Sequence, residues 1–144
     1  MTGIDFHVNA PDKVGYACRL LRKAVGKGAK VVVTGEPALL RELDTALWTF
    51  SALEFIPHCR VSAASTVLAA SPVVLSEAAD AVPHHEVLLN LGSRVPEGFQ
   101  AFVRLIEIVT SEEDDLQQGR RRWKHYADRG YAPIKHDQTA REAS

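Results

Sequence analysis

The sequence has little of what metal sites and disulfide-linked scaffolds require. Its 144 residues include two cysteines, Cys18 and Cys59, and no Cys-x-x-Cys pair. Structural zinc needs three or four convergent ligands, and neither His84-His85-Glu86 nor His58 beside Cys59 has a suitable spacing. We therefore expect no metal site, reduced thiols, and histidines that lie at the surface or cap local structure.

The sequence also lacks segments typical of membrane or secreted proteins. No apolar run approaches the roughly 18–20 residues that cross a bilayer, and residues 1–5 do not resemble a signal peptide. The formal net charge is −1, whereas dedicated nucleic-acid binders carry a basic excess. These absences predict a cytoplasmic protein without membrane contact, on which any electropositive site is local.

Nucleotide-binding and catalytic motifs are missing as well. The glycine-rich stretch Gly26-Lys27-Gly28 follows a predicted helix and precedes a predicted strand, which reverses the order of a phosphate-binding loop. A dinucleotide fingerprint would follow the first strand, but residues 9–13 contain no glycine. No Gly-x-Ser-x-Gly elbow is present. The sequence thus predicts no cofactor and no enzymatic activity of the chain itself.

Apolar runs alternate with helical periodicity along the chain. This alternation predicts a single α/β domain over residues 1–135, Rossmann-like, with a mostly parallel sheet and helices on both faces. Residues 136–144 have almost no apolar content, so we expect a mobile polar tail. Residues 49–60 are expected to form a loop and residues 96–101 a short helix. The pattern predicts strands at residues 3–8, 30–34, 72–75, 86–91 and 104–109, and helices at residues 12–27, 37–48 and 111–129.

The last predicted helix has recognisable ends. Ser111 is the expected N-cap, with Asp114 three residues later as in a variant capping box. Acidic residues follow at the positive end of the helix dipole, and arginines lie toward its negative end. Gly130 is the expected C′ residue, because glycine readily adopts the left-handed conformation.

One face of this helix suits a ligand that combines a carboxylate with an apolar group. Arg120, Trp123 and Lys124 share that face by their i, i+3 and i+4 spacing. Arginine binds carboxylates bidentately, and the indole offers apolar area. Two alternatives remain open: the cations only solvate the helix, or cations beside an aromatic ring bind nucleic acid.

Aromatic residues gather around the end of the second predicted helix. Trp48 follows the apolar stripe that contains Leu43 and Leu47, which favours a core position. Phe55 and Pro57 come next, in the predicted loop. An exposed apolar patch for a protein partner is the alternative.

These segments, in this order and separation, resemble the chi subunit family of the bacterial DNA polymerase III holoenzyme. The resemblance covers nearly the whole chain, to about Tyr131. It rests on Leu43-Asp44-x-Ala46-Leu47-Trp48, on Phe55-x-Pro57-His58, and on Arg120-x-Arg122-Trp123-Lys124-x-Tyr126 followed by Gly130 and an aromatic residue.

The resemblance implies a non-catalytic accessory subunit of the replicase. It implies that the chain links the clamp loader, through the psi subunit, to the acidic, apolar C-terminal tail of single-stranded DNA-binding protein on the lagging strand. In this role the chain would contact DNA only indirectly, through its protein partners. The alternative function is a module that binds single-stranded nucleic acid directly. By position, Trp48 and Phe55 fall at the psi interface. The tail would be held by Val109, Arg120, Trp123 and Lys124.

Overall fold

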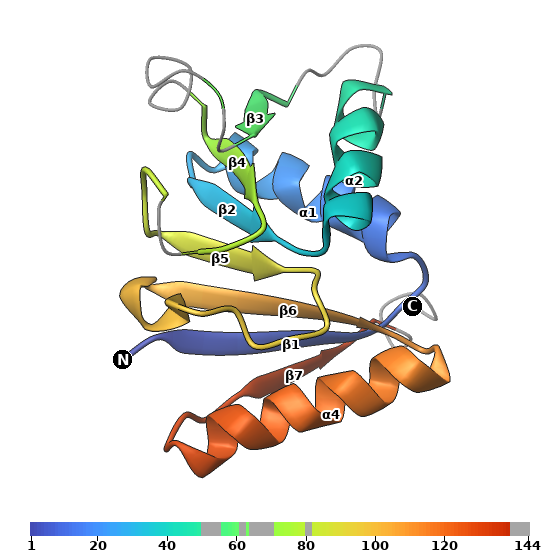
Figure 1. Ribbon diagram of the computed structural model, residues 1–144, viewed down its shortest axis with the longest axis vertical. Helices are drawn as coiled ribbons and strands as arrows, with labels where there is room; N and C mark the ends of the chain where they lie inside the picture. Colours follow the sequence, from blue (N-terminus) through green and yellow to red (C-terminus); the bar gives the residue numbers. More distant parts are fainter. Residues whose placement is uncertain (50–55, 61–62, 64–70, 80–81, 139–144) are drawn as a thin grey trace.

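The computed structural model describes residues 1–49, 56–60, 63, 71–79 and 82–138. Strands and helices alternate along these residues, as the hydrophobic pattern predicts (Figure 1). The elements are β1 (Gly3–Ala10), α1 (Lys13–Gly26), β2 (Val31–Thr34), α2 (Pro37–Thr49), β3 (His58–Arg60), β4 (Val73–Ser76), β5 (Val87–Asn90), the 3₁₀ turn η1 (Phe99–Ala101), β6 (Arg104–Thr110), α4 (Glu113–Asp128) and β7 (Ile134–Asp137).

The strands form one sheet in which every pairing is parallel. Its order is β3-β4-β2-β5-β6-β1-β7. The interior strand β2 is a run of β-branched residues that are buried throughout, because a parallel sheet is covered on both faces. The predicted α/β class and mostly parallel sheet are therefore confirmed.

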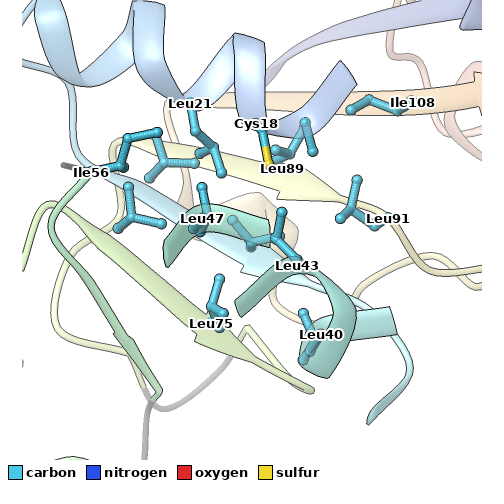
Figure 2. Packing of buried hydrophobic residues seen from close by; sticks show 14 of the residues in the cluster. Cys18, Leu21, Leu40, Leu43, Leu47, Ile56, Leu75, Leu89, Leu91 and Ile108 are labelled. Carbon is cyan, nitrogen blue, oxygen red and sulfur yellow. The ribbon is translucent and has the colours of Figure 1, made fainter. Parts of the chain in front are cut away.

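Helices cover both faces of the sheet. On one face, α1 and α2 pack leucines such as Leu21, Leu43 and Leu47 against the sheet residues Leu75 and Leu89 (Figure 2). On the other face lies α4, whose Trp123 and Tyr126 pack with Phe6 of β1 and Leu105 of β6. This two-sided arrangement also confirms the prediction. It leaves the surface of α4 and the surface of α1 on opposite sides of the molecule (Figure 1).

The first helix begins where the sequence predicts. The Asp12 side chain accepts a hydrogen bond from Gly15 N at 2.9 Å and so caps α1. The start of α4 differs from the prediction, since Glu112 is the N-cap and makes no side-chain capping bond. The Ser111–Asp114 capping box is therefore wrong, whereas Gly130 follows the C-cap with the expected positive φ of 88°.

Asp115 organises the start of α4 in place of a capping box. Its carboxylate accepts hydrogen bonds from Thr110 N at 2.7 Å, from the Thr110 hydroxyl at 3.0 Å and from Lys13 Nζ at 2.9 Å. Burial alone raises the pKa of Asp115, but these partners outweigh it and hold the pKa below its ordinary value. The carboxylate thereby ties the end of β6 to α1.

Two strands were not predicted. Residues 58–60 belong to β3 rather than to a loop, and residues 134–137 form β7, which pairs in parallel with β1. The predicted tail is therefore wrong at its start: His136 and Asp137 lie in the sheet, and residues 139–144 lie outside the described residues. β7 lies at the edge of the sheet and is paired on one side only, so it can carry polar residues. Its polar sequence therefore gives no clear strand signal.

Candidate functional site

A pocket of about 530 Å³ lies between α4 and the β1–β6–β7 edge of the sheet. Among the described residues, two cations and no carboxylate line it. The lining residues are Leu116, Gly119, Arg120 and Trp123 of α4, Phe6, Val8 and Asn9 of β1, Val109 of β6, and Lys135 of β7.

The apolar part of this pocket is set by close packing of α4 on the sheet. The rings of Trp123 and Phe6 are 5.0 Å apart between centroids and inclined at 58°. Gly119 faces Val109 so closely that a Cβ at position 119 would lie 2.9 Å from Val109 Cγ2. Only glycine allows this approach without a shift of the helix or of Val109. Helix α4 therefore packs close to β6, and Val109 and Trp123 line the same pocket.

The positive charge comes from two different elements. Arg120 projects from α4, and Lys135 comes from β7, where it is aligned with Phe6 of β1. Both side chains are exposed. Asn9 donates a hydrogen bond to Asp137 Oδ1 at 3.1 Å, and His136 Nε2 lies 2.8 Å from Asp5 Oδ1. These contacts fix β7, and hence the backbone of Lys135, beside the pocket.

The structure brings together three of the four residues predicted to hold the tail. Val109, Arg120 and Trp123 line the pocket, but Lys124 does not. The Lys124 side chain is 76% exposed, and its Nζ lies 4.0 Å from Asp128 Oδ2, one helical turn away. Lys135 was missed because it enters the site only through the pairing of β7 with β1, for which the sequence carries no local signal.

Arg122, between the pocket residues Arg120 and Trp123, is buried in the core with 2% of its surface exposed. Its Nε donates to Glu107 Oε1 at 3.0 Å, and its Nη1 donates to the Ser93 carbonyl at 3.1 Å. Tyr126 and Asn90 also donate to the Glu107 carboxylate, at 2.6 and 2.9 Å. The arginines of α4 thus have different roles, because Arg122 belongs to the core and not to the pocket.

The pKa values of Glu107 and Tyr126 depend on burial and on the contacts between the members of this cluster. Burial raises the pKa of Glu107, and the Arg122 charge with the hydrogen bonds from Tyr126 and Asn90 opposes that rise. The pKa of Tyr126 is raised as well, first by burial and then by the Glu107 charge. Tyr126 therefore acts as a neutral donor to the Glu107 carboxylate.

Trp48 forms a second surface feature at the end of α2. Its side chain is 60% exposed, although the preceding Leu47 is 1% exposed, so the expected core position of Trp48 is wrong. Its ring centroid lies 5.0 Å from that of His58. His58 Nδ1 donates to the Ile56 carbonyl at 2.7 Å, and His58 Nε2 lies 2.9 Å from Asp44 Oδ1. The Trp48 indole therefore packs against a histidine ring that two hydrogen-bonding partners hold in place, and most of its surface is exposed. Phe55, the other residue predicted here, lies outside the described residues.

The described part of the chain contains neither a metal-binding cluster nor a membrane-spanning helix. Within residues 1–49, 56–60, 63, 71–79 and 82–138, no three His, Cys, Asp or Glu side chains converge to hold a metal ion. No helix in these ranges is long and apolar enough to span a bilayer.

Fold and pocket together define the class of this molecule: a Rossmann-like α/β protein with a cationic, aromatic-lined pocket between its last helix and the sheet edge. The chain belongs to the DNA polymerase III chi subunit (HolC) family, whose model matches residues 1–133. It is 32% identical to DNA polymerase III subunit chi of Pseudomonas aeruginosa over 136 residues, which cover 91% of this chain and 93% of that relative. The chi subunit of Haemophilus influenzae is 27% identical over 117 residues, covering 80% of each chain. The family inferred from the sequence motifs is therefore confirmed.

Proposed function

We propose that this protein is a non-catalytic accessory subunit of the bacterial replicase that works in the cytoplasm. It links the clamp loader, through the psi subunit, to single-stranded DNA-binding protein on the lagging strand. One observation carries this proposal: Arg120 and Lys135 border a pocket whose wall contains Trp123 and Val109. A peptide that ends in an apolar residue with a free carboxylate matches this combination of charge and apolar surface.

In this arrangement the peptide end lies along α4. Arg120 takes the terminal carboxylate, and the last apolar side chain enters the hollow between Trp123 and Val109. Acidic residues upstream in the peptide meet Lys135 at the pocket rim and Lys124 farther out. Hydrogen bonds to a charged group each contribute about 1.5–3 kcal/mol, so the carboxylate contact supplies much of the affinity. The exposed charges make the interaction weaker as salt increases.

Titration with a peptide that copies the C-terminal tail of single-stranded DNA-binding protein tests this proposal. We expect micromolar binding by calorimetry, and loss of most of that affinity when the last residue of the peptide is removed, because both the carboxylate and the apolar side chain are then misplaced. A peptide with the same composition in scrambled order is the control. Absence of binding to the intact peptide, or equal binding to all three peptides, would contradict the proposal.

A comparison of two lysines tests which cation serves the acidic part of the peptide. Lys135→Ala should weaken tail binding by up to about 5-fold, as expected for a partly exposed ion pair. Lys124→Ala should have a smaller effect, because Lys124 lies outside the pocket and near Asp128. The two variants remove the same charge, so a larger effect of Lys124→Ala in the same titration would assign this role to α4 alone.

Trp48 is our proposed anchor for psi. An exposed tryptophan at an interface centre commonly contributes 2 kcal/mol or more, so Trp48→Ala should weaken psi binding by about 30-fold or more. Binding of co-expressed psi can be measured by surface plasmon resonance. Val103→Ala serves as the control, because Val103 is also exposed, at 72%. Tail-peptide binding should be unchanged in both variants. Unaltered psi affinity in Trp48→Ala would remove this surface from the proposal.

A further inference from the structure

The outer face of α1 carries positive charge that the proposed peptide site does not use. Arg19, Lys23 and Lys27 follow one another at intervals of four residues, so they form a row along one face of the helix. Lys30 follows three positions after Lys27, beyond the end of α1. All four side chains are exposed, and together they are named the α1 stripe. The opposite face of the helix, with Ala17, Cys18 and Leu21, is buried.

The net charge of −1 conceals this local excess. Residues 13–35 contain six of the 17 lysines and arginines and none of the 18 aspartates and glutamates. Within the described part of the chain, no carboxylate forms an ion pair with any member of the α1 stripe. Lys13, in contrast, is paired with Asp115 at 2.9 Å. None of these four exposed cations is therefore held in an ion pair by a described acidic group.

Stabilisation of the helix explains only part of this row. Cations favour the C-terminal end of a helix, but that effect falls off within the last turn. It applies to Lys23 and Lys27, whereas Arg19 lies mid-helix and Lys30 lies outside the helix. The row is thus longer than the helix dipole requires.

The composition of the stripe favours nucleic acid over a protein as its partner. Centres of protein interfaces are rich in apolar and aromatic side chains and poor in lysine. Among the described residues, the exposed large hydrophobic side chains are Met1, Trp48, Val103 and Ile134, and none of them lies on α1. Exposed cations on a helix without exposed large hydrophobic side chains instead suit phosphates, where binding is driven by release of counterions.

We propose that the α1 stripe is a sequence-independent contact for the phosphate backbone of DNA. Successive stripe residues on the helix are about 6 Å apart along its axis, so several can meet one strand at the same time. The stripe and the Arg120 pocket lie on opposite faces of the sheet (Figure 1). DNA bound at α1 therefore leaves the pocket open, and this contact does not depend on the proposed tail binding.

Fluorescence anisotropy with a labelled 30-nucleotide oligo-dT, recorded at several salt concentrations, tests the stripe on the full chain. We expect weak binding at low salt, with Kd about 10–100 µM. The variant Lys23→Gln/Lys27→Gln should bind about 10-fold more weakly. Its salt slope should be shallower by about 1.4, because each lost single-strand phosphate contact accounts for about 0.7. Circular dichroism checks that the variants are folded.

The control variant is Arg41→Gln/Arg121→Gln, which removes the same charge from exposed positions on α2 and α4. It should keep near-normal DNA affinity. Equal losses in the two variants, or no binding of the unchanged protein at low salt, would overturn the proposal. The tail peptide should bind Lys23→Gln/Lys27→Gln normally. If that variant loses the acidic peptide and keeps DNA, the stripe serves a protein partner and our proposal is wrong.

Discussion

Replacement of Arg122 by alanine is expected to lower the free energy of unfolding by about 3–5 kcal/mol. The guanidinium is buried, and it donates to Glu107 Oε1 and to the Ser93 carbonyl. Its removal leaves the Glu107 carboxylate, which is fully buried, without its cation and leaves the Ser93 carbonyl without this donor. Urea denaturation followed by circular dichroism measures the change.

The neighbouring arginine provides a matched control for this effect. Arg121 has the same side chain on the same helix but is exposed, so Arg121→Ala should change stability by less than about 0.5 kcal/mol. The combined change Glu107→Gln/Arg122→Met should be less harmful than Arg122→Ala, because it removes both charges and fills the space. Similar stability of Arg122→Ala and Arg121→Ala would show that the buried ion pair contributes little to the fold.

Replacement of Arg120 by alanine should leave stability almost unchanged and weaken binding of the tail peptide about 10- to 100-fold. This range corresponds to loss of a hydrogen-bonded contact with a carboxylate, about 1.5–3 kcal/mol. Arg120 is exposed at the pocket rim, and no carboxylate from the part of the chain that the structure describes lines the pocket. We therefore expect Arg120 to be the strongest partner of the peptide carboxylate. Calorimetric titration of the variant measures the loss.

Two further measurements separate this role from a general effect of charge. Arg121→Ala removes the same charge from another face of α4, and it should reduce tail affinity by less than about 3-fold. The peptide that lacks its last residue should bind the unchanged protein and Arg120→Ala with similar weak affinity, because the missing contact is the same in both cases. If Arg120→Ala and Arg121→Ala weaken binding equally, the peptide is held by the overall field of the helix and not by the pocket.

The motif Arg120-x-Arg122-Trp123 contributes both to the pocket and to the buried core, and the sequence does not show which residue does which. Arg120 and Trp123 border the pocket, whereas Arg122 turns inward toward Glu107 together with Tyr126, four residues later. Helical spacing places Arg122 and Tyr126 on one face and Arg120 and Trp123 on another. It does not reveal that the first face is buried, because an arginine in the core requires an acidic partner from a distant strand.

Several properties of this protein followed from the sequence by itself. Apolar runs and helical periodicity predicted the helices and the strands rich in apolar residues, because local backbone preference and burial of one face act over a few residues. The same spacing placed Arg120 and Trp123 on a common face, and the motifs identified the family. The sequence also contains the uneven distribution of charge along α1, which is concealed when only the net charge is considered.

The tertiary structure decided what depends on contacts between distant segments. The pairing of β7 with β1 brought Lys135 to the pocket, and the polar sequence of this edge strand carried no sign of it. Packing of Gly119 against Val109 set the depth of the helix on the sheet. Leu47 and Trp48 both belong to α2, and the packing of this helix on the sheet buried Leu47 but left Trp48 exposed. In each case the outcome depends on packing against another strand or helix, which local sequence patterns do not report.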